Sequence, residues 1–218
     1  MYKSFFLSLI SILIFLFTNI SAQDNNSVQI NGGIIYPMSS SNGLTGIIQY
    51  NYSINKQIYL YIYSGYSSWD RFNITFLEDH SEVQKQTKFI SYSADQHKLI
   101  PVYIGSRINF HTNKLFTSFV NLEIGYSYLS YNSYTNRKSV DPETGEVLSY
   151  YVDGSTKEEI TENLIGVGIG AGISHPVTEN LNLILTFKLN SYLNSEYYGF
   201  FRAKGTYTMF LAGFSYDL

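Results

Sequence analysis

The sequence predicts an all-β fold, an eight-stranded antiparallel up-and-down transmembrane β-barrel. Three observations lead to it. Apolar and small or polar residues alternate with a period of two in segments of about ten residues, which is typical of strands that span an outer membrane. Short and long connections alternate along the chain. After the N-terminal segment, no run approaches the roughly eighteen apolar residues of a membrane-spanning helix.

Residues 1–22 are typical of a cleaved secretory signal peptide. Lys3 gives the segment its positive start, an apolar run follows from Phe5 to Phe17, and Ala22 suits the position before the cut. An uncleaved membrane anchor is the alternative, although the run is short for a spanning helix. We expect residues 23–218 to form one outer-membrane β-barrel domain.

The clearest strand is 164–174, where Ile165, Ile169 and Ile173 share one face and four glycines lie on the other. We expect aliphatic faces to contact lipid and small or polar faces to point into the barrel. The glycines then leave room for a bulky facing side chain, such as a tyrosine of 57–69. The predicted strands are 28–36, 44–54, 57–69, 98–110, 115–129, 164–174, 181–192 and 207–218.

The connections at 55–56, 111–114 and 175–180 are short, whereas those at 37–43, 70–97, 130–163 and 193–206 are longer. Outer-membrane barrels have short periplasmic turns and longer outer loops. With both termini periplasmic, every long connection therefore falls outside. Asp141 to Gly145 has the composition of a turn and could cap a hairpin that extends two strands beyond the membrane.

Composition excludes several classes of protein. The chain has 218 residues, a formal net charge of −3 and no cysteine. It therefore has no disulfide, thiolate metal site or thiol nucleophile, and its charge argues against a nucleic-acid partner. The 21 tyrosines suit the aromatic girdles where barrel strands meet lipid headgroups.

Three segments carry a resemblance to a known family. They are the Ile-Pro-Val-Tyr-Ile-Gly strand at 100–105, the glycine-alternating strand 164–174 and the final segment 211–218. With these, the mature chain resembles the eight-stranded outer-membrane β-barrel domain family of Gram-negative bacteria. The resemblance implies a fold and a place in the outer membrane, but no single activity. It also implies recognition of the C-terminal strand by the barrel-assembly machinery.

Four charged residues have the inward parity: Arg107, Glu123, Lys188 and Asp217. An eight-stranded barrel is just wide enough for side chains to fill, and buried charges must be paired or hydrated. We expect a charge-balanced polar network in the lumen. A narrow ion path is the alternative.

A weaker candidate site lies in the outer loop 70–97, where Glu78, Asp79 and His80 are adjacent and His97 closes the loop. A carboxylate–histidine pair can activate water or a serine, as a lipid hydrolase or protease requires. No catalytic, cofactor or metal motif accompanies these residues, so a solvated polar loop is the favoured interpretation.

The sequence therefore predicts a non-enzymatic outer-membrane protein with a structural or surface-interaction role. A rigid barrel would display the loops 70–97 and 130–163, and these loops would contact an extracellular or envelope partner. The second loop is acidic and could bind a basic partner or Ca²⁺, but it lacks a calcium-loop spacing, so a solvated face is the favoured interpretation. Three alternatives remain: a narrow porin-like channel, an outer-membrane lipid hydrolase or protease, and a secreted lipocalin-type barrel.

Overall fold

The computed structural model describes residues 26–38, 40–80, 85–112, 115–194 and 206–218. The predicted signal peptide and parts of four connections lie outside these residues. The described residues contain no helix long and apolar enough to cross a membrane. In the described residues, nine strands form one antiparallel sheet. They are β1 (Ser27–Pro37), β2 (Gly43–Ser53), β3 (Ile58–Trp69), β4 (Phe72–Asp79), β5 (Gln86–Thr112), β6 (Thr117–Val140), β7 (Val147–Pro176), β8 (Leu181–Tyr192) and β9 (Tyr207–Asp217).

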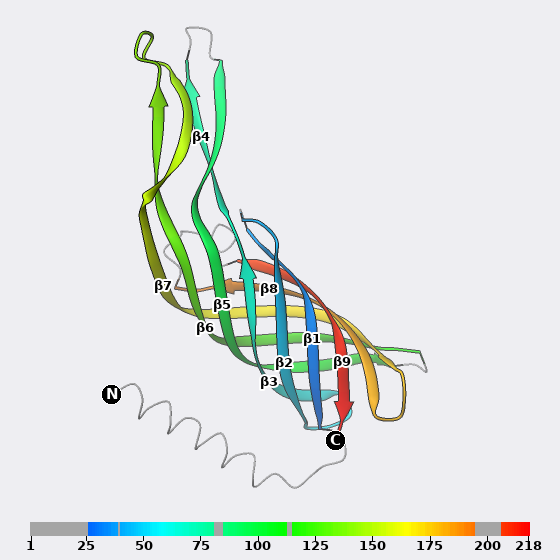
Figure 1. The fold of residues 1–218 in the computed structure, drawn as a ribbon. Coiled ribbons are helices and arrows are strands. Elements are labelled where there is room, and N and C mark those ends of the chain that lie inside the picture. The colour runs from blue at the N-terminus through cyan, green and yellow to red at the C-terminus, as the bar shows by residue number, and fades with distance from the viewer. Residues whose placement is uncertain (1–25, 39, 81–84, 113–114, 195–205) are drawn as a thin grey trace, which may run out of the picture.

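Eight of these strands form a closed ring, which confirms the predicted fold class. The sheet order is β3-β2-β1-β9-β8-β7-β6-β5-β4, and an additional pairing of β3 with β5 closes the barrel. All pairs are antiparallel, and neighbours in the ring follow the chain except where β4 is passed over. Figure 1 shows the barrel with the C-terminus at one end, and two hairpins that rise from the other end.

The barrel surface is apolar outside and polar inside, as the strand alternation predicts. Ile30, Ile48 and Ile104 point outward and are 61%, 62% and 58% exposed. The residues between the outward positions are buried and include Gln29, Asn51 and Asn190. A lipocalin-type barrel would have the opposite arrangement.

The prediction of loops at 70–97 and 130–163 is wrong in its details. β5, β6 and β7 have 27, 24 and 30 residues and continue beyond the barrel rim. The strand outside the ring, β4, pairs along its length with the upper part of β5. We call the resulting projection the arm; it comprises β4 and residues 86–95, 132–140 and 147–160 (Figure 1). The turn at 141–146 caps one of its hairpins, as the sequence suggests.

The strands bend where the barrel becomes the arm. The β5–β6 register shifts between Asp95 and Lys98, and Gln96 between them has a φ of 53°, the left-handed region that few non-glycine residues adopt. The Gln96 side chain accepts a hydrogen bond from Asn132. Above Ala94 and Ser133, β5 and β6 no longer pair, so the arm consists of two separate hairpins that contact each other through side chains.

Candidate functional site

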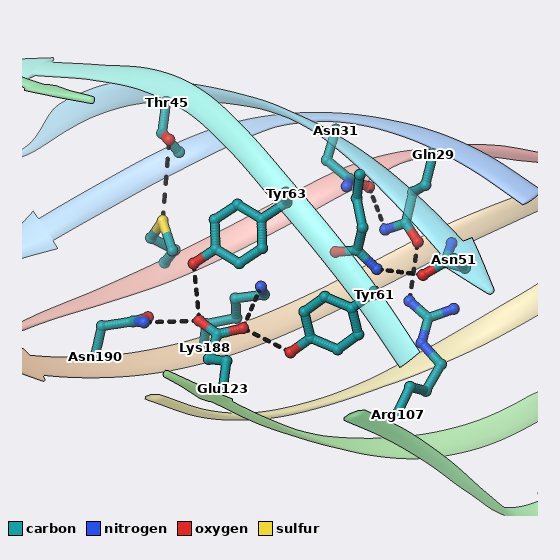
Figure 2. Close-up of polar contacts among 12 residues, drawn as sticks. Gln29, Asn31, Thr45, Asn51, Tyr61, Tyr63, Arg107, Glu123, Lys188 and Asn190 are labelled. Atoms are coloured by element: carbon teal, nitrogen blue, oxygen red, sulfur yellow. Dashed lines mark hydrogen bonds and ion pairs between the residues drawn. The ribbon is translucent and has the colours of Figure 1, made fainter. Parts of the chain in front are cut away.

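Glu123 lies at the centre of the barrel interior and accepts four hydrogen bonds. Its Oε2 is 2.7 Å from Lys188 Nζ and 2.7 Å from the Tyr61 hydroxyl. Its Oε1 is 2.8 Å from the Tyr63 hydroxyl and 2.7 Å from Asn190 Nδ2. The five side chains come from β3, β6 and β8 and converge as Figure 2 shows. We call them the Glu123 hub.

The hub satisfies a buried charge pair. The Lys188 and Glu123 side chains are 2% and 0% exposed, and a charge at such depth is tolerated only with a partner and further hydrogen bonds. Lys188 Nζ also lies 3.9 Å from the centre of the Tyr63 ring, a cation–π distance. Every strong acceptor position of the carboxylate is thereby used.

Glycines on neighbouring strands make room for the hub. Gly168 is the register partner of both Glu123 and Asn190. A Cβ there would come within 2.4 Å of Asn190 Nδ2 and 2.7 Å of Glu123 Cγ. The glycine face of β7 therefore does accommodate bulky side chains. They are Tyr103, Phe119 and Glu123 rather than a tyrosine of β3; Tyr61 instead approaches Gly105 on β5.

Arg107 stands apart from the hub. Its guanidinium donates to Gln29 Oε1 at 2.9 Å and lies 4.0 Å from the centre of the Phe119 ring. Gln29 in turn donates to Asn31 (Figure 2). An amide oxygen and an aromatic ring, rather than a carboxylate, therefore contact the Arg107 guanidinium. The four charged residues that were predicted to form one polar network in the lumen do not form a single network.

Asp217 is not in the interior network. The prediction placed it there from its parity, but it lies at the C-terminal rim, where it is half-buried and accepts a hydrogen bond from Asn182 at 3.2 Å. Alternation fixes which face a side chain is on. It does not fix how deep along the barrel axis the side chain lies.

The filled interior determines what the barrel can do chemically. Tyr63, Tyr103, Phe119 and Lys188 are among the largest fully buried side chains of the described residues. Tyr63 and Lys188 belong to the Glu123 hub, Tyr103 stacks on Tyr63, and Phe119 lies against Arg107. These side chains fill the interior that an ion path would have to cross. An eight-stranded barrel has little additional width, so this arrangement favours a plugged barrel over a channel.

His97 lies at the mouth of the barrel, where the arm begins. Its ring stacks between Trp69 and Tyr131, with ring centres 5.0 and 5.1 Å away. Its Nδ1 donates to the Asp70 carbonyl oxygen at 2.6 Å. These contacts make His97 part of the aromatic packing at the mouth.

The predicted outer-loop candidates do not converge. Glu78 and Asp79 pair with Thr87 and Gln86 near the tip of the first hairpin, and His80 follows them. His97 is ten residues below Thr87 along β5, roughly 30 Å away at the usual rise of a strand. Glu78 is bonded to Tyr150 rather than to a histidine. Among the residues that the structure describes, no three His, Asp or Glu side chains are grouped to hold a metal.

A stacked aromatic contact joins the two hairpins of the arm. The Tyr150 ring of β7 lies parallel to Phe76 of β4, with ring centres 3.9 Å apart, and 5.7 Å from Phe89 of β5. The Tyr150 hydroxyl donates to Glu78, and this bond raises the pKa of Tyr150. Ser91 donates to Asn136 at 2.7 Å lower in the arm. The sequence alone did not indicate this contact.

A second charged contact lies at an irregular segment of the arm. The β6–β7 register shifts between Ser133 and Thr135. There Ser155 donates hydrogen bonds to Asp153, and Arg137 lies 2.5 Å from the same carboxylate. The bonds from Ser155, more than the Arg137 charge, lower the pKa of Asp153.

Comparison with known proteins supports the fold. No protein-family model matches the chain, and no curated protein matches its sequence. The chain has the fold of the small eight-stranded outer-membrane β-barrels. It is similar to Neisserial surface protein A, with a TM-score of 0.57 and 15% identity over 88% of this chain and 97% of that one. It is also similar to a major outer membrane protein from Thermus thermophilus, with a TM-score of 0.54 and 13% identity over 88% of this chain and 99% of that one.

Proposed function

We propose that this protein is an outer-membrane β-barrel that displays its arm outside the cell for contact with a partner, and that it catalyses no reaction. The observation that carries the proposal is the length of β5, β6 and β7. A strand needs about 9–11 residues to cross an outer membrane, and these strands have 27, 24 and 30. The barrel and the arm are therefore parts of the same strands.

The surfaces of the two parts support this orientation. The barrel belt is apolar, which suits outer-membrane lipid. The segment 130–163, most of which belongs to the arm or to the turn that caps it, contains seven acidic and three basic side chains. This charge favours a basic or mixed-charge partner. The short turns and the C-terminal end of β9 lie at the opposite, periplasmic end in this proposal. Recognition of β9 by the barrel-assembly machinery and removal of residues 1–22 remain predictions.

Cell fractionation with heat-modifiability tests the membrane assignment. We expect the protein in the outer-membrane fraction, and a band on an SDS gel that shifts when the sample is boiled. A soluble protein whose band does not shift would contradict the proposal.

Single cysteines test the orientation, since the native chain has none. On intact cells, a membrane-impermeant maleimide should label Thr75→Cys in the arm. Glu179→Cys, in the short turn between β7 and β8, is the matched control and should react only after the outer membrane is permeabilised. The reverse pattern would overturn the assignment of the arm to the outside.

The channel alternative has its own test. Because the Glu123 hub fills the lumen, we expect the purified protein to give no conductance steps in a planar bilayer. Reproducible steps that Glu123→Gln alters would favour the channel and contradict the display role as the sole function.

A further inference from the structure

Arg107 is a buried cation that has no carboxylate partner. Among the described residues, the buried lysine, arginine, aspartate and glutamate side chains are Arg107, Lys188 and Glu123. Glu123 forms an ion pair with Lys188, and none of the four hydrogen bonds to its carboxylate comes from Arg107. A buried charge is costly unless an opposite charge accompanies it. The interior therefore carries one positive charge that no described carboxylate contacts.

The Arg107 guanidinium has a donor that the described residues do not use. Its central carbon lies 4.0 Å from the centre of the Phe119 ring, and its Nη2 donates to Gln29 (Figure 2). Its Nε is buried and forms no hydrogen bond with a described residue. The N–H groups of arginine lie in the guanidinium plane. An acceptor for Nε must therefore lie at this edge of the group.

Asn121 lies opposite Arg107 and is also without a hydrogen bond. The two residues are register partners on β6 and β5, and both are buried on the inward side of the barrel. Asn121 is 1% exposed, and neither its Nδ2 nor its Oδ1 is bonded to a described residue. The pair lies two residues from the Glu123–Gly105 pair, toward the short turn that follows β5. Both groups are therefore below the Glu123 hub, on the side away from the arm.

Thr186 adds a third polar group to this part of the lumen. It is buried on β8, and its Oγ1 has no hydrogen-bond partner among the described residues. Its register partner is Gly172, and the Phe119 ring that contacts Arg107 lies over this glycine. We call Arg107, Asn121 and Thr186 the Arg107 site. Buried polar groups are almost always hydrogen-bonded, so three of them around one aromatic ring indicate a ligand.

We propose that the Arg107 site binds a monatomic anion of the size of chloride. Arg107 Nε, Asn121 Nδ2 and the Thr186 hydroxyl donate hydrogen bonds to the anion, and its charge neutralises the guanidinium. Water could also accept these bonds, but it would leave the buried positive charge uncompensated. An anion that keeps one water molecule also provides a donor for Asn121 Oδ1. The site concerns only the barrel, so it does not depend on where the arm lies.

The space beside Asn121 suits a small ion. A Cβ placed on Gly168 or on Gly172 would come within 2.4 Å of a neighbouring side-chain atom. On Gly170, which lies between them, the nearest side-chain atoms would be Lys188 Cγ at 3.2 Å and Asn121 Cβ at 3.5 Å. The interior is therefore less tightly filled at this level, although the difference is small. A monatomic anion fits such a space better than a phosphate or a carboxylate does.

The dependence of stability on chloride tests the proposal. The protein is folded into phosphatidylcholine vesicles and unfolded in urea, while sodium chloride replaces sodium gluconate at constant ionic strength. An anion that binds only the folded state lowers the unfolding equilibrium constant about tenfold for each tenfold rise in its concentration above Kd. We expect this slope for the native protein, measured from the heat-modifiable band. Arg107→Gln should abolish the slope, whereas Arg137→Gln, which removes an exposed cation of the arm, should retain it.

A carboxylate built into the site gives a second test that leaves Arg107 in place. Asn121→Asp has nearly the shape of the native side chain and puts a negative charge opposite Arg107. Opposite charges on directly paired residues attract each other, so this carboxylate should replace the anion. We expect Asn121→Asp to be as stable in gluconate as the native protein is in saturating chloride, and to show no chloride dependence. If Arg107→Gln does not fold, this comparison decides the question.

Crystals of the native protein grown with sodium bromide locate the ion directly, because bromide scatters X-rays anomalously. We expect an anomalous peak in contact with Arg107 Nε and Asn121 Nδ2, at the bromide concentrations that stabilise the protein. Crystals of Asn121→Asp should lack this peak.

Four results would overturn the inference. Equal native stability in chloride and gluconate would show that the site holds only water. An unchanged chloride slope in Arg107→Gln, or in Asn121→Asp, would place the anion elsewhere. A bromide peak that appears only at concentrations without effect on stability would be an adventitious ion only. None of these results would affect the display proposal, which the maleimide labelling tests separately.

Discussion

A close ion pair of the barrel interior and a close ion pair of the arm have opposite surroundings. Lys188 and Glu123 are 2.7 Å apart with side chains 2% and 0% exposed. Arg137 and Asp153 are 2.5 Å apart, but the arginine side chain is 59% exposed. The two ion pairs therefore contribute differently to stability, although their N–O distances are similar. The first pair is needed because either charge alone would be buried, whereas water screens the second.

The same strands thus follow two packing rules along their length. Below His97, β5, β6 and β7 are part of the eight-stranded ring, which has polar groups inside. Above it they separate into hairpins that contact each other through Tyr150 and Phe76. The barrel should depend on its polar interior, and the arm on its aromatic contact.

The largest effect is expected from breaking the buried pair. Glu123→Leu leaves Lys188 charged and buried without its carboxylate, which should cost about 3–5 kcal/mol of unfolding free energy. The measurement is the urea midpoint at which the heat-modifiable band disappears. Glu123→Leu combined with Lys188→Met should recover most of the loss, because no unpaired charge remains. Equal stability of the single and double variants would show that the pair is not what holds the interior.

The next effect concerns the space around the hub. Gly168→Ala places a methyl group against Asn190 and Glu123, and overpacking of this kind costs about 1–3 kcal/mol. Gly32→Ala is the matched control, because its nearest neighbour is 4.0 Å away. We expect a lower urea midpoint for Gly168→Ala alone. Equal midpoints for the two variants would contradict the close packing of β7 against the hub.

These contrasts show what the sequence can and cannot predict. Alternation identified the eight barrel strands and the inward side of Arg107, Glu123 and Lys188, because lipid outside and a crowded interior select residues with a strict period of two. It did not predict that Lys188, rather than Arg107, pairs with Glu123. That choice depends on the register of β6, β7 and β8, which no local pattern encodes.

β4 was missed for a related physical reason. Phe72, Ile74 and Phe76 do alternate with polar or exposed residues, but no lipid lies outside the membrane to make one face uniformly apolar. The aromatic partner of Phe76 is Tyr150, 74 positions later in the chain and in a segment predicted as an acidic loop. Such a contact follows from the tertiary arrangement and has no local signature.

A smaller and local effect is expected in the arm. Phe76→Ala removes the stacking partner of Tyr150 and should raise the rate of proteolysis between the hairpins by roughly fivefold, the factor that loss of one aromatic pair gives. The urea midpoint of the barrel should not change. Tyr150→Phe keeps the ring and loses only the bond to Glu78, so its rate should lie between those of the native protein and Phe76→Ala. A changed barrel midpoint would show that the two regions are one cooperative unit.

The smallest effect should come from the exposed pair. The pKa of Asp153 is lowered, so the bonds that it accepts stabilise the arm above the usual aspartate pKa and are lost as pH falls through the lowered value. The Ser155 amide chemical shift, followed by NMR against pH, should report this step, and Asp153→Asn should abolish it. The bonds from Ser155 lower the pKa of Asp153 more than the Arg137 charge does. Ser155→Ala should therefore raise the pH midpoint of this titration more than Arg137→Gln. The reverse order would mean that the ion pair with Arg137, despite its exposure, lowers the pKa of Asp153 more than the bonds from Ser155 do.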